Sequence, residues 1–165
     1  MSIARETSRF GLLTVNDEDI LTFPRGIPGF ETHYQWVLAG EDDSPIKWLQ
    51  SLADGDVALP VADPRIIRAD YNARISEGDL AQLKAEETED LALLLVLSIP
   101  AASAWDMTAN LRAPLVINHK KRIGAQVIAS NEEYEVRAFV LGEGMRESMG
   151  RKAAAEASPP AAAGA

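Results

Sequence analysis

The sequence predicts a mostly β fold: a small antiparallel β-barrel-like domain with one short helical insert. Three observations predict it. Short apolar segments with period-2 alternation recur along the chain, turns rich in Gly, Asp and Asn separate them, and strands do not alternate regularly with helices. The 165 residues, 47% of them hydrophobic, fit one domain with a mainly aliphatic core. A closed barrel and a two-sheet sandwich both fit these observations.

Two segments carry the alternation most clearly. In residues 33–40, Tyr34, Trp36 and Leu38 share one face, and the apolar side chains of residues 57–63 alternate in the same way. Pro60 lies inside the second segment and cannot donate a ladder hydrogen bond, so this strand is expected at a sheet edge or a bulge. Further strands are expected at 10–15, 19–23, 46–52, 115–118, 122–129 and 134–141.

Residues 91–99 form an apolar run without alternation. Such a run fits a strand buried on both faces or a buried helical segment, and Pro100, which ends it early, favours the strand. The one helix is expected after Ser76, which can cap it, with Asp79 at the capping-box spacing.

The end of the chain differs from the rest in composition. Residues 153–165 are mostly Ala, and Pro159 and Pro160 interrupt any alanine helix. We therefore expect a β domain at 1–145 and a disordered Ala/Pro-rich tail at 146–165.

The net charge of −9 is concentrated in the first part of the chain. Residues 1–90 hold 18 acidic and 8 basic residues, whereas residues 91–165 hold 7 acidic and 8 basic residues. Nucleic-acid binding requires clustered Lys and Arg, so no direct nucleic-acid contact is expected, and the basic run 120–122 is interpreted as a solvated turn. The acid serves either solubility or attraction to a basic partner.

Cysteine content and apolar runs indicate the compartment. The absence of cysteine excludes disulfides and thiolate sites and agrees with a reducing environment. The first ten residues lack the apolar stretch of a signal peptide, and the run 91–100 is shorter than the roughly 20 residues that span a bilayer. The protein is therefore expected to be cytoplasmic, with no membrane partner.

The sequence contains no pattern typical of catalysis or metal binding. His33 and His119 lack metal-ligand spacing, no serine lies in a nucleophile elbow, and no phosphate-binding glycine motif or calcium loop occurs. The sequence thus predicts a protein that is not an enzyme and has no cofactor. An enzyme or small-ligand barrel of unknown substrate is the alternative.

Five phrases, in their order and spacing, point to one family. They are LTFPRGIPGFE (21–31), IKWLQSL (46–52), VADPRIIRADY (61–71), NLRAPLVIN (110–118) and GAQVI (124–128). Over about residues 8–141 the chain resembles FliW, the bacterial flagellar assembly factor; the Ala/Pro-rich tail is not part of the pattern.

The resemblance implies a non-enzymatic, chaperone-like role in the cytoplasm and a small antiparallel barrel. FliW proteins bind flagellin, and they bind CsrA, the carbon storage regulator, whose repression of flagellin translation they relieve. Free flagellin competes for FliW, so the flagellin level feeds back on its own synthesis. Flagellin and CsrA are thus the expected partners, and the free chain is expected to be a monomer. An acidic chain would also be attracted to a basic RNA-binding regulator.

The sequence leaves two kinds of contact surface as alternatives. Flagellin would dock on a β edge or groove with aromatic anchors, and the regulator would meet an acidic face at 41–43, 54–56 and 77–90; the two surfaces could overlap. Gly26 and Gly29 are expected to adopt positive φ in a stiff turn, which leaves Phe30 and Glu31 pointing either into the barrel or toward a partner. The candidate protein-binding residues are Phe30, Glu31, Trp48, Gln50, Asp63, Tyr71 and Asn118.

Overall fold

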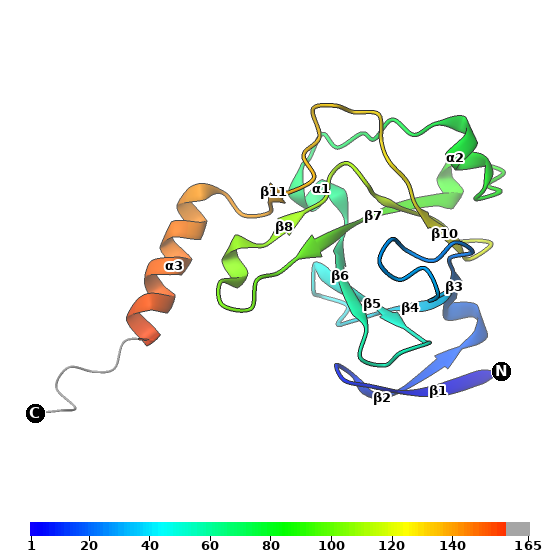
Figure 1. The fold of residues 1–165 in the computed structure, drawn as a ribbon, viewed down its shortest axis with the longest axis horizontal. Helices are drawn as coiled ribbons and strands as arrows, with labels where there is room; N and C mark the ends of the chain where they lie inside the picture. The colour runs from blue at the N-terminus through cyan, green and yellow to red at the C-terminus, as the bar shows by residue number, and fades with distance from the viewer. Residues whose placement is uncertain (158–165) are drawn as a thin grey trace, which may run out of the picture.

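A computed structural model describes residues 1–157. A closed barrel occupies the centre of the molecule (Figure 1). The strands are β1 (Ser2–Thr7), β2 (Gly11–Asn16), β3 (Ile20–Thr22), β4 (Gln35–Ala39), β5 (Ile46–Ser51), β6 (Ala58–Ala62), β7 (Leu91–Ser98), β8 (Thr108–Ala109), β9 (Leu115–Asn118), β10 (Ile123–Gln126) and β11 (Ala138–Phe139). The helices are α1 (Pro64–Ile67), α2 (Glu77–Ala81) and α3 (Glu143–Ala157), with single 3-10 turns η1 (Asp17–Asp19), η2 (Thr88–Asp90) and η3 (Ala104–Asp106).

Seven strands make the barrel, in the order β7-β6-β5-β4-β3-β10-β9, and it closes where β9 pairs with β7. The neighbouring strands of this ring run antiparallel except β3 and β10, which are parallel where Ile123 pairs with Thr22. The prediction of a mostly β, barrel-like fold is confirmed, and the pairing of β7 with β9 decides for the barrel over the sandwich.

Alternate side chains of the barrel strands fill its interior. Register partners such as Leu49 and Leu59 point to the same side and pack in one apolar core. Phe23 and Trp36 have no exposed area and meet edge to face, with ring centroids 6.5 Å apart. Gly124 on β10 makes room for Phe23, because a Cβ at this position would lie 2.5 Å from the Phe23 ring.

The β1–β2 hairpin lies outside the barrel, below β4 in the view of Figure 1. Its Val15 packs with Val37 and Leu52 in a small cluster of its own. The sequence analysis did not predict β1, because most of its side chains are exposed and polar and Ile3 alone faces the cluster. The strand expected at 134–141 is reduced to the two residues of β11, which pair with β8.

Pro60 was expected to mark a sheet edge or a bulge, but it lies in an interior strand whose register with β5 is continuous, so this expectation is wrong. β6 is flanked by β5 and β7. On the β5 side Pro60 pairs with Trp48, but the pairing with β7 covers only Val61 and Ala62. Pro60 thus stands just outside the ladder with β7, where its missing N–H removes no hydrogen bond from that ladder.

The predicted helical insert is α2. The Ser76 hydroxyl accepts a hydrogen bond from the Asp79 N–H at 3.2 Å, as the capping pattern requires. Just after the helix, Leu83 is fully buried against Val116 and Val127 on the outer face of the barrel. The structure adds two helices that were not predicted, α1 and α3.

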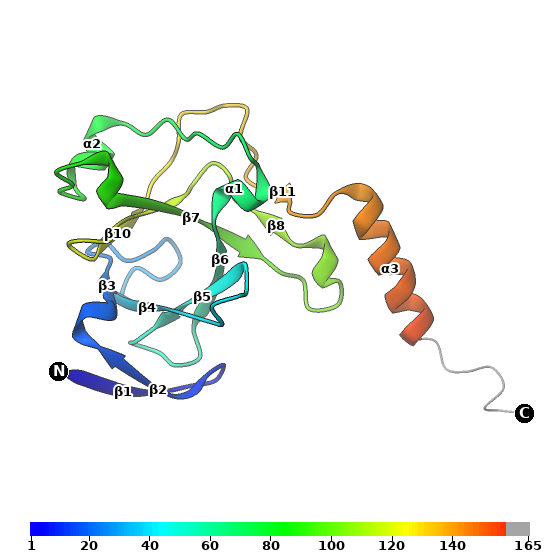
Figure 2. The ribbon, with the colours of Figure 1, turned by 180° about the vertical axis from the view of Figure 1, so that it is seen from behind.

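The prediction of disorder from residue 146 is wrong for residues 146–157, which form most of α3. The helix projects away from the barrel (Figure 2) and is attached at its first turns. Arg146 forms an ion pair with Asp106 at 3.5 Å and lies over the Phe139 ring. The segment is rich in good helix formers, and both prolines come after its last residue, so neither interrupts it. The rest of the predicted tail, 158–165, lies outside the described residues.

Candidate protein-binding surface

The segment between β3 and β4 is a tight turn that depends on two glycines. Gly26 has a φ of +66° and Gly29 of +93°, in the left-handed region that glycine adopts without strain. A Cβ on Gly26 would lie 2.6 Å from the carbonyl oxygen of Phe30, so no larger residue fits there. Ile27 and Phe30 exchange backbone hydrogen bonds of 3.4 and 2.6 Å. The predicted stiff turn with positive φ at both glycines is confirmed.

Within this turn, Phe30 points toward the barrel and Glu31 toward solvent. The half-buried Phe30 ring packs on the core, with its centroid 6.0 Å from that of Trp36 and 5.6 Å from that of His33. The exposed Glu31 carboxylate accepts a hydrogen bond from the Gly29 N–H at 3.0 Å. Hydrogen bonds from the backbone N–H groups of Gly29 and of Glu31 itself hold the pKa of Glu31 below its ordinary value.

A histidine connects this turn to β5. His33 lies in the turn before β4, and its Nδ1 is 2.8 Å from Oγ of the fully buried Ser51. The Ser51 hydroxyl already accepts hydrogen bonds from the N–H groups of Ala53 and Asp54, so it donates its own proton to His33. This pair holds two segments together, and because Ser51 has no exposed area it offers no nucleophile to a substrate.

Trp48 and Gln50 lie on the outer face of β5 and differ sharply in exposure. Trp48 is partly exposed, and the Arg9 guanidinium stacks 3.5 Å above its ring. Gln50 is 0% exposed, and its Nε2 donates to the carbonyls of Ser51, Gly55 and Val57, which closes the β5–β6 turn. Trp48 is available to a partner in the free chain, whereas Gln50 is not.

Asp63 and Tyr71 lie at the two ends of the α1 segment. The Asp63 carboxylate caps α1 by accepting from the Arg65 N–H at 2.9 Å and remains half exposed. The Tyr71 hydroxyl donates to the Leu111 carbonyl at 2.7 Å, and its ring stacks on Tyr134 with centroids 4.9 Å apart. Burial, followed by the neighbouring Tyr134, raises the pKa of Tyr71 to about 12. Both residues are engaged in local structure, and Asp63 offers more free surface.

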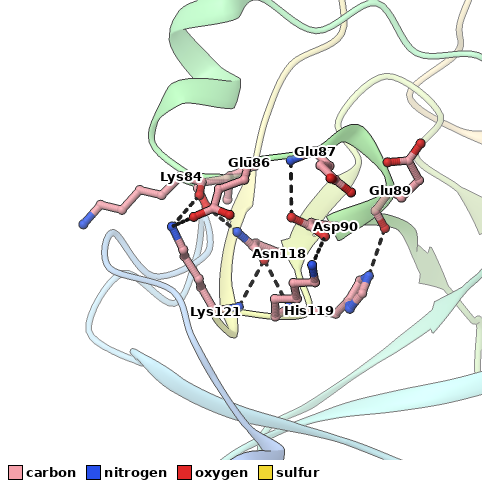
Figure 3. Close-up of polar contacts among 10 residues, drawn as sticks. Lys84, Glu86, Glu87, Glu89, Asp90, Asn118, His119 and Lys121 are labelled. Atoms are coloured by element: carbon pink, nitrogen blue, oxygen red, sulfur yellow. Dashed lines mark hydrogen bonds and ion pairs between the residues drawn. The ribbon is translucent and has the colours of Figure 1, made fainter.

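Asn118 is the centre of a polar cluster where β9 ends (Figure 3). It is 1% exposed. Its Nδ2 donates to the Leu83 carbonyl at 2.9 Å, and its Oδ1 accepts from the N–H groups of Lys120 and Lys121 at 3.1 Å each. One side chain therefore shapes the β9–β10 turn and ties it to the end of α2. Like Gln50, Asn118 has no surface to offer a partner.

Asp90 stands beside Asn118 in the same cluster (Figure 3). This buried carboxylate forms an ion pair with Lys120 at 3.2 Å and accepts from the Glu87 N–H at 3.3 Å. Burial acts to raise the pKa of Asp90, but the hydrogen bonds from Lys120 and Glu87 and the charges of Lys120 and His119 outweigh it, so the pKa lies below its ordinary value. Asp90 thereby fixes the η2 turn against the β9–β10 turn.

The barrel has a hollow at each end. The hollow that we call the first opening, about 270 Å³, lies at the carboxyl end of β7 and is lined in part by Phe30, Val96 and the polar Asn110. The second opening, about 650 Å³, lies at the amino end of β7, and interior-facing Leu38 and Leu94 line it. Its rim carries Glu18, Asp19, His119 and Arg122.

The second opening is the feature that sequence reasoning missed. Its walls come from β2, β3 and β4, which follow one another in the chain, and from β7 and β9, which reach them only in the folded barrel. The sequence carries no signal for it: Leu38 shares a face with the buried Trp36, and only the structure shows that it is 43% exposed.

Metal-ligand clusters and membrane-spanning helices are both absent from the described residues. Within residues 1–157, no group of three His, Cys, Asp or Glu side chains is arranged to hold a metal ion. None of the helices in that range is both long and apolar enough to cross a bilayer. The described surface carries exposed carboxylates, a few exposed apolar side chains and several hollows, among them the two at the ends of the barrel.

Comparisons with known proteins agree on one family. The family model described as FliW protein matches residues 4–140. The chain is 43% identical over 137 residues to the flagellar assembly factor FliW of Thermotoga maritima, which covers 82% of this chain and 92% of that protein. It is 38% identical over 139 residues to the protein of the same name from Caldanaerobacter subterraneus, with 83% and 92% covered. A solved structure of a flagellar assembly factor FliW superposes with a TM-score of 0.78 at 33% identity, over 86% of this chain and 99% of that one.

Proposed function

The chain belongs to the FliW family of flagellar assembly factors, and from this membership we propose that it binds flagellin and the translational regulator CsrA. In this role the protein is a cytoplasmic, non-enzymatic adaptor. Its binding to CsrA relieves the repression of flagellin translation, and free flagellin competes for it. The observation that carries the proposal is the match of the family model over residues 4–140, which spans the whole barrel.

The charge of the chain supports the regulator as a partner. CsrA binds RNA and must present a basic surface, and this chain has a net charge of −9. Carboxylates are exposed in the β4–β5 turn at residues 41–43 and in the turn before β6, at Asp54 and Asp56. Complementary charge speeds encounter and favours the correct orientation of two proteins.

For the flagellin contact, five of the candidate residues keep exposed surface in the free chain. Of these, Trp48 and Phe30 supply aromatic area, and Glu31 and Asp63 supply exposed carboxylates at turns that the backbone holds in place. Tyr71 contributes only the part of its ring that Tyr134 leaves uncovered. Rigid turns lower the entropic cost of forming an interface.

The rival function, an enzyme or small-ligand barrel, receives less support. Neither histidine lies beside an accessible nucleophile: His33 contacts buried Ser51, and His119 contacts the Glu89 carbonyl at 3.0 Å. The second opening is the place where a small apolar ligand would fit.

Size-exclusion chromatography of mixtures tests the proposal. The purified chain is mixed at micromolar concentration with monomeric flagellin, with CsrA, and with an unrelated basic protein as the control for non-specific charge attraction. We expect an earlier-eluting complex with flagellin and with CsrA but not with the control. If the chain elutes unchanged with both expected partners, the proposal is wrong.

A further inference from the structure

The second opening presents an apolar surface at the amino end of β7. Interior-facing side chains of four barrel strands form it: Leu21, Leu38, Leu94 and Ile117, together with Ala92. Leu38 and Ala92 are exposed there, although their neighbours along the interior, such as Leu49 and Leu115, are fully buried. Exposed apolar side chains that continue a barrel core form a preformed socket for another apolar group.

One side of this opening is strongly acidic. The η1 turn contributes Asp17, Glu18 and Asp19, and the β4–β5 turn, which starts directly after the lining residue Gly40, contributes Glu41, Asp42 and Asp43. All six side chains are exposed. Within the described residues, Asp17 alone among the six forms an ion pair, with the terminal amino group of Met1 at 3.8 Å.

Basic residues of the β9–β10 turn lie next to η1, since Arg122 and Lys121 line one further hollow together with Asp17, but two of the three basic side chains are in ion pairs. Lys120 is paired with Asp90 at 3.2 Å and Lys121 with Glu86 at 4.0 Å. Arg122, also on the rim, forms no ion pair with any of the described residues. Glu18 and Asp19 line the opening and four more exposed carboxylates lie in the adjoining turns, against the one uncompensated guanidinium of Arg122, so the surroundings of the opening are acidic and favour a partner with a basic surface.

We infer that the second opening is the socket for an apolar side chain of the basic regulator, with the carboxylates of η1 and the β4–β5 turn meeting the Lys and Arg residues around that side chain. The inference rests on the proposed function, because it assigns a place to one of the two proposed partners. An apolar anchor in a desolvated pocket, surrounded by charged contacts, is the usual arrangement of an interface hot spot.

The first opening fits this partner less well. It has less than half the volume, and its lining includes Asn110, Gln126 and Arg137. Arg137 would repel a basic surface, and no cluster of acidic residues lines this hollow. Charge complementarity therefore selects the second opening.

The test compares two leucine variants of the full chain. Leu38→Asp puts a carboxylate into the socket, and Leu12→Asp makes the same change at a leucine that is 64% exposed on the β1–β2 hairpin and does not line the opening. Because both variants add a negative charge, electrostatic attraction to CsrA does not decrease in either. We expect the dissociation constant for CsrA, measured by calorimetry, to rise about tenfold or more for Leu38→Asp and to stay within about twofold for Leu12→Asp.

A second pair of variants tests the rim without touching the socket. Glu41→Gln, Asp42→Asn and Asp43→Asn together remove the acid of the β4–β5 turn. Glu143→Gln, Glu147→Gln and Glu156→Gln remove the same charge from α3. We expect the first triple variant to lower the association rate with CsrA and to flatten its salt dependence, and the second to leave both unchanged.

The possible results separate a failure of the inference from a failure of the proposed function. If the parent chain fails to bind CsrA, the proposed function itself is wrong and the inference falls with it. If the parent binds but folded Leu38→Asp binds equally well, the inference alone is overturned. If Leu38→Asp proves unfolded by circular dichroism, the rim variants decide, and equal effects of the two triples overturn it. If Leu38→Asp abolishes only a self-association seen by sedimentation, a second copy occupies the socket and the inference is wrong.

Discussion

Replacing Asn118 with alanine tests whether this asparagine acts inside the molecule or at a contact surface. The side chain makes three hydrogen bonds, one to the Leu83 carbonyl and two from the N–H groups of Lys120 and Lys121. A protein hydrogen bond contributes about 0.5–1.5 kcal/mol net, and a buried group left without a partner costs about 1–3 kcal/mol. Asn118→Ala should therefore lower the free energy of unfolding by about 2–4 kcal/mol.

Urea unfolding followed by tryptophan fluorescence measures this change, because Trp36 is fully buried in the folded chain. Asn16→Ala is the matched control: Asn16 is exposed and makes no capping hydrogen bond with its side chain. We expect the control to stay within about 0.5 kcal/mol of the parent. An Asn118→Ala variant with the parent's stability and weakened partner binding would refute the internal role.

Three further predictions concern the turn at 23–34 and the buried carboxylate. Phe30→Ala should lower the free energy of unfolding in urea by about 2–3 kcal/mol, because the ring is half-buried against Trp36. Tyr34→Ala, at a more exposed ring, should lower it by less than about 1 kcal/mol. Equal losses would mean that Phe30 does not pack on the core. Gly26→Ala should destabilise the chain more than Gly29→Ala. Both positions need a positive φ, but only at Gly26 would a Cβ clash with the backbone, 2.6 Å from the Phe30 carbonyl oxygen. The reverse order of the urea midpoints would contradict this prediction. Asp90→Asn should destabilise the chain at neutral pH but much less at about pH 2. A carboxylate whose pKa is lowered by folding stabilises the folded chain above its unfolded pKa of about 3.9, and this stabilisation is lost as pH falls through the folded pKa. A difference in stability between the two proteins that does not depend on pH would argue against the ion pair with Lys120.

Local patterns predicted the strands well where one face is buried and the other is not. β4 and β6 alternate because the interior of the barrel accepts every second side chain. β1 does not alternate, since its hairpin buries little, and it was not predicted. Pro60 predicts a sheet edge or a bulge, yet an interior strand tolerates it because the ladder with β7 begins only at Val61.

The prediction of a disordered tail is wrong in part because it rests on the Ala- and Pro-rich composition and not on where the prolines lie. Ala-rich sequence with two prolines suggested disorder, but the prolines follow the last residue of α3. Contacts distant in the sequence attach this helix: Gly150 lies against Trp105, and Arg146 reaches Asp106. Such contacts leave no local signal, so the sequence predicts a helix here only through its propensity.

The family phrases located the right segments but not the role of each side chain. Gln50 and Asn118 are polar, yet both are buried: the Gln50 Nε2 donates to carbonyls of the adjoining β5–β6 turn while its Oε1 has no partner within the described residues, and the Asn118 Nδ2 donates to the Leu83 carbonyl, distant in the sequence. Whether a polar side chain finds such partners depends on the closed fold. The same holds for the second opening, where β7 and β9 meet β2, β3 and β4, which precede them by a long stretch of sequence, only in the folded chain.

A cell-free translation reaction tests the central claim most directly. A reporter carrying a flagellin mRNA leader is first repressed by purified CsrA, then the chain is added in molar excess, and finally monomeric flagellin is added. The account predicts that the chain restores reporter synthesis and that flagellin restores repression. Synthesis that stays repressed after the chain is added, at concentrations where CsrA is fully active, would contradict it.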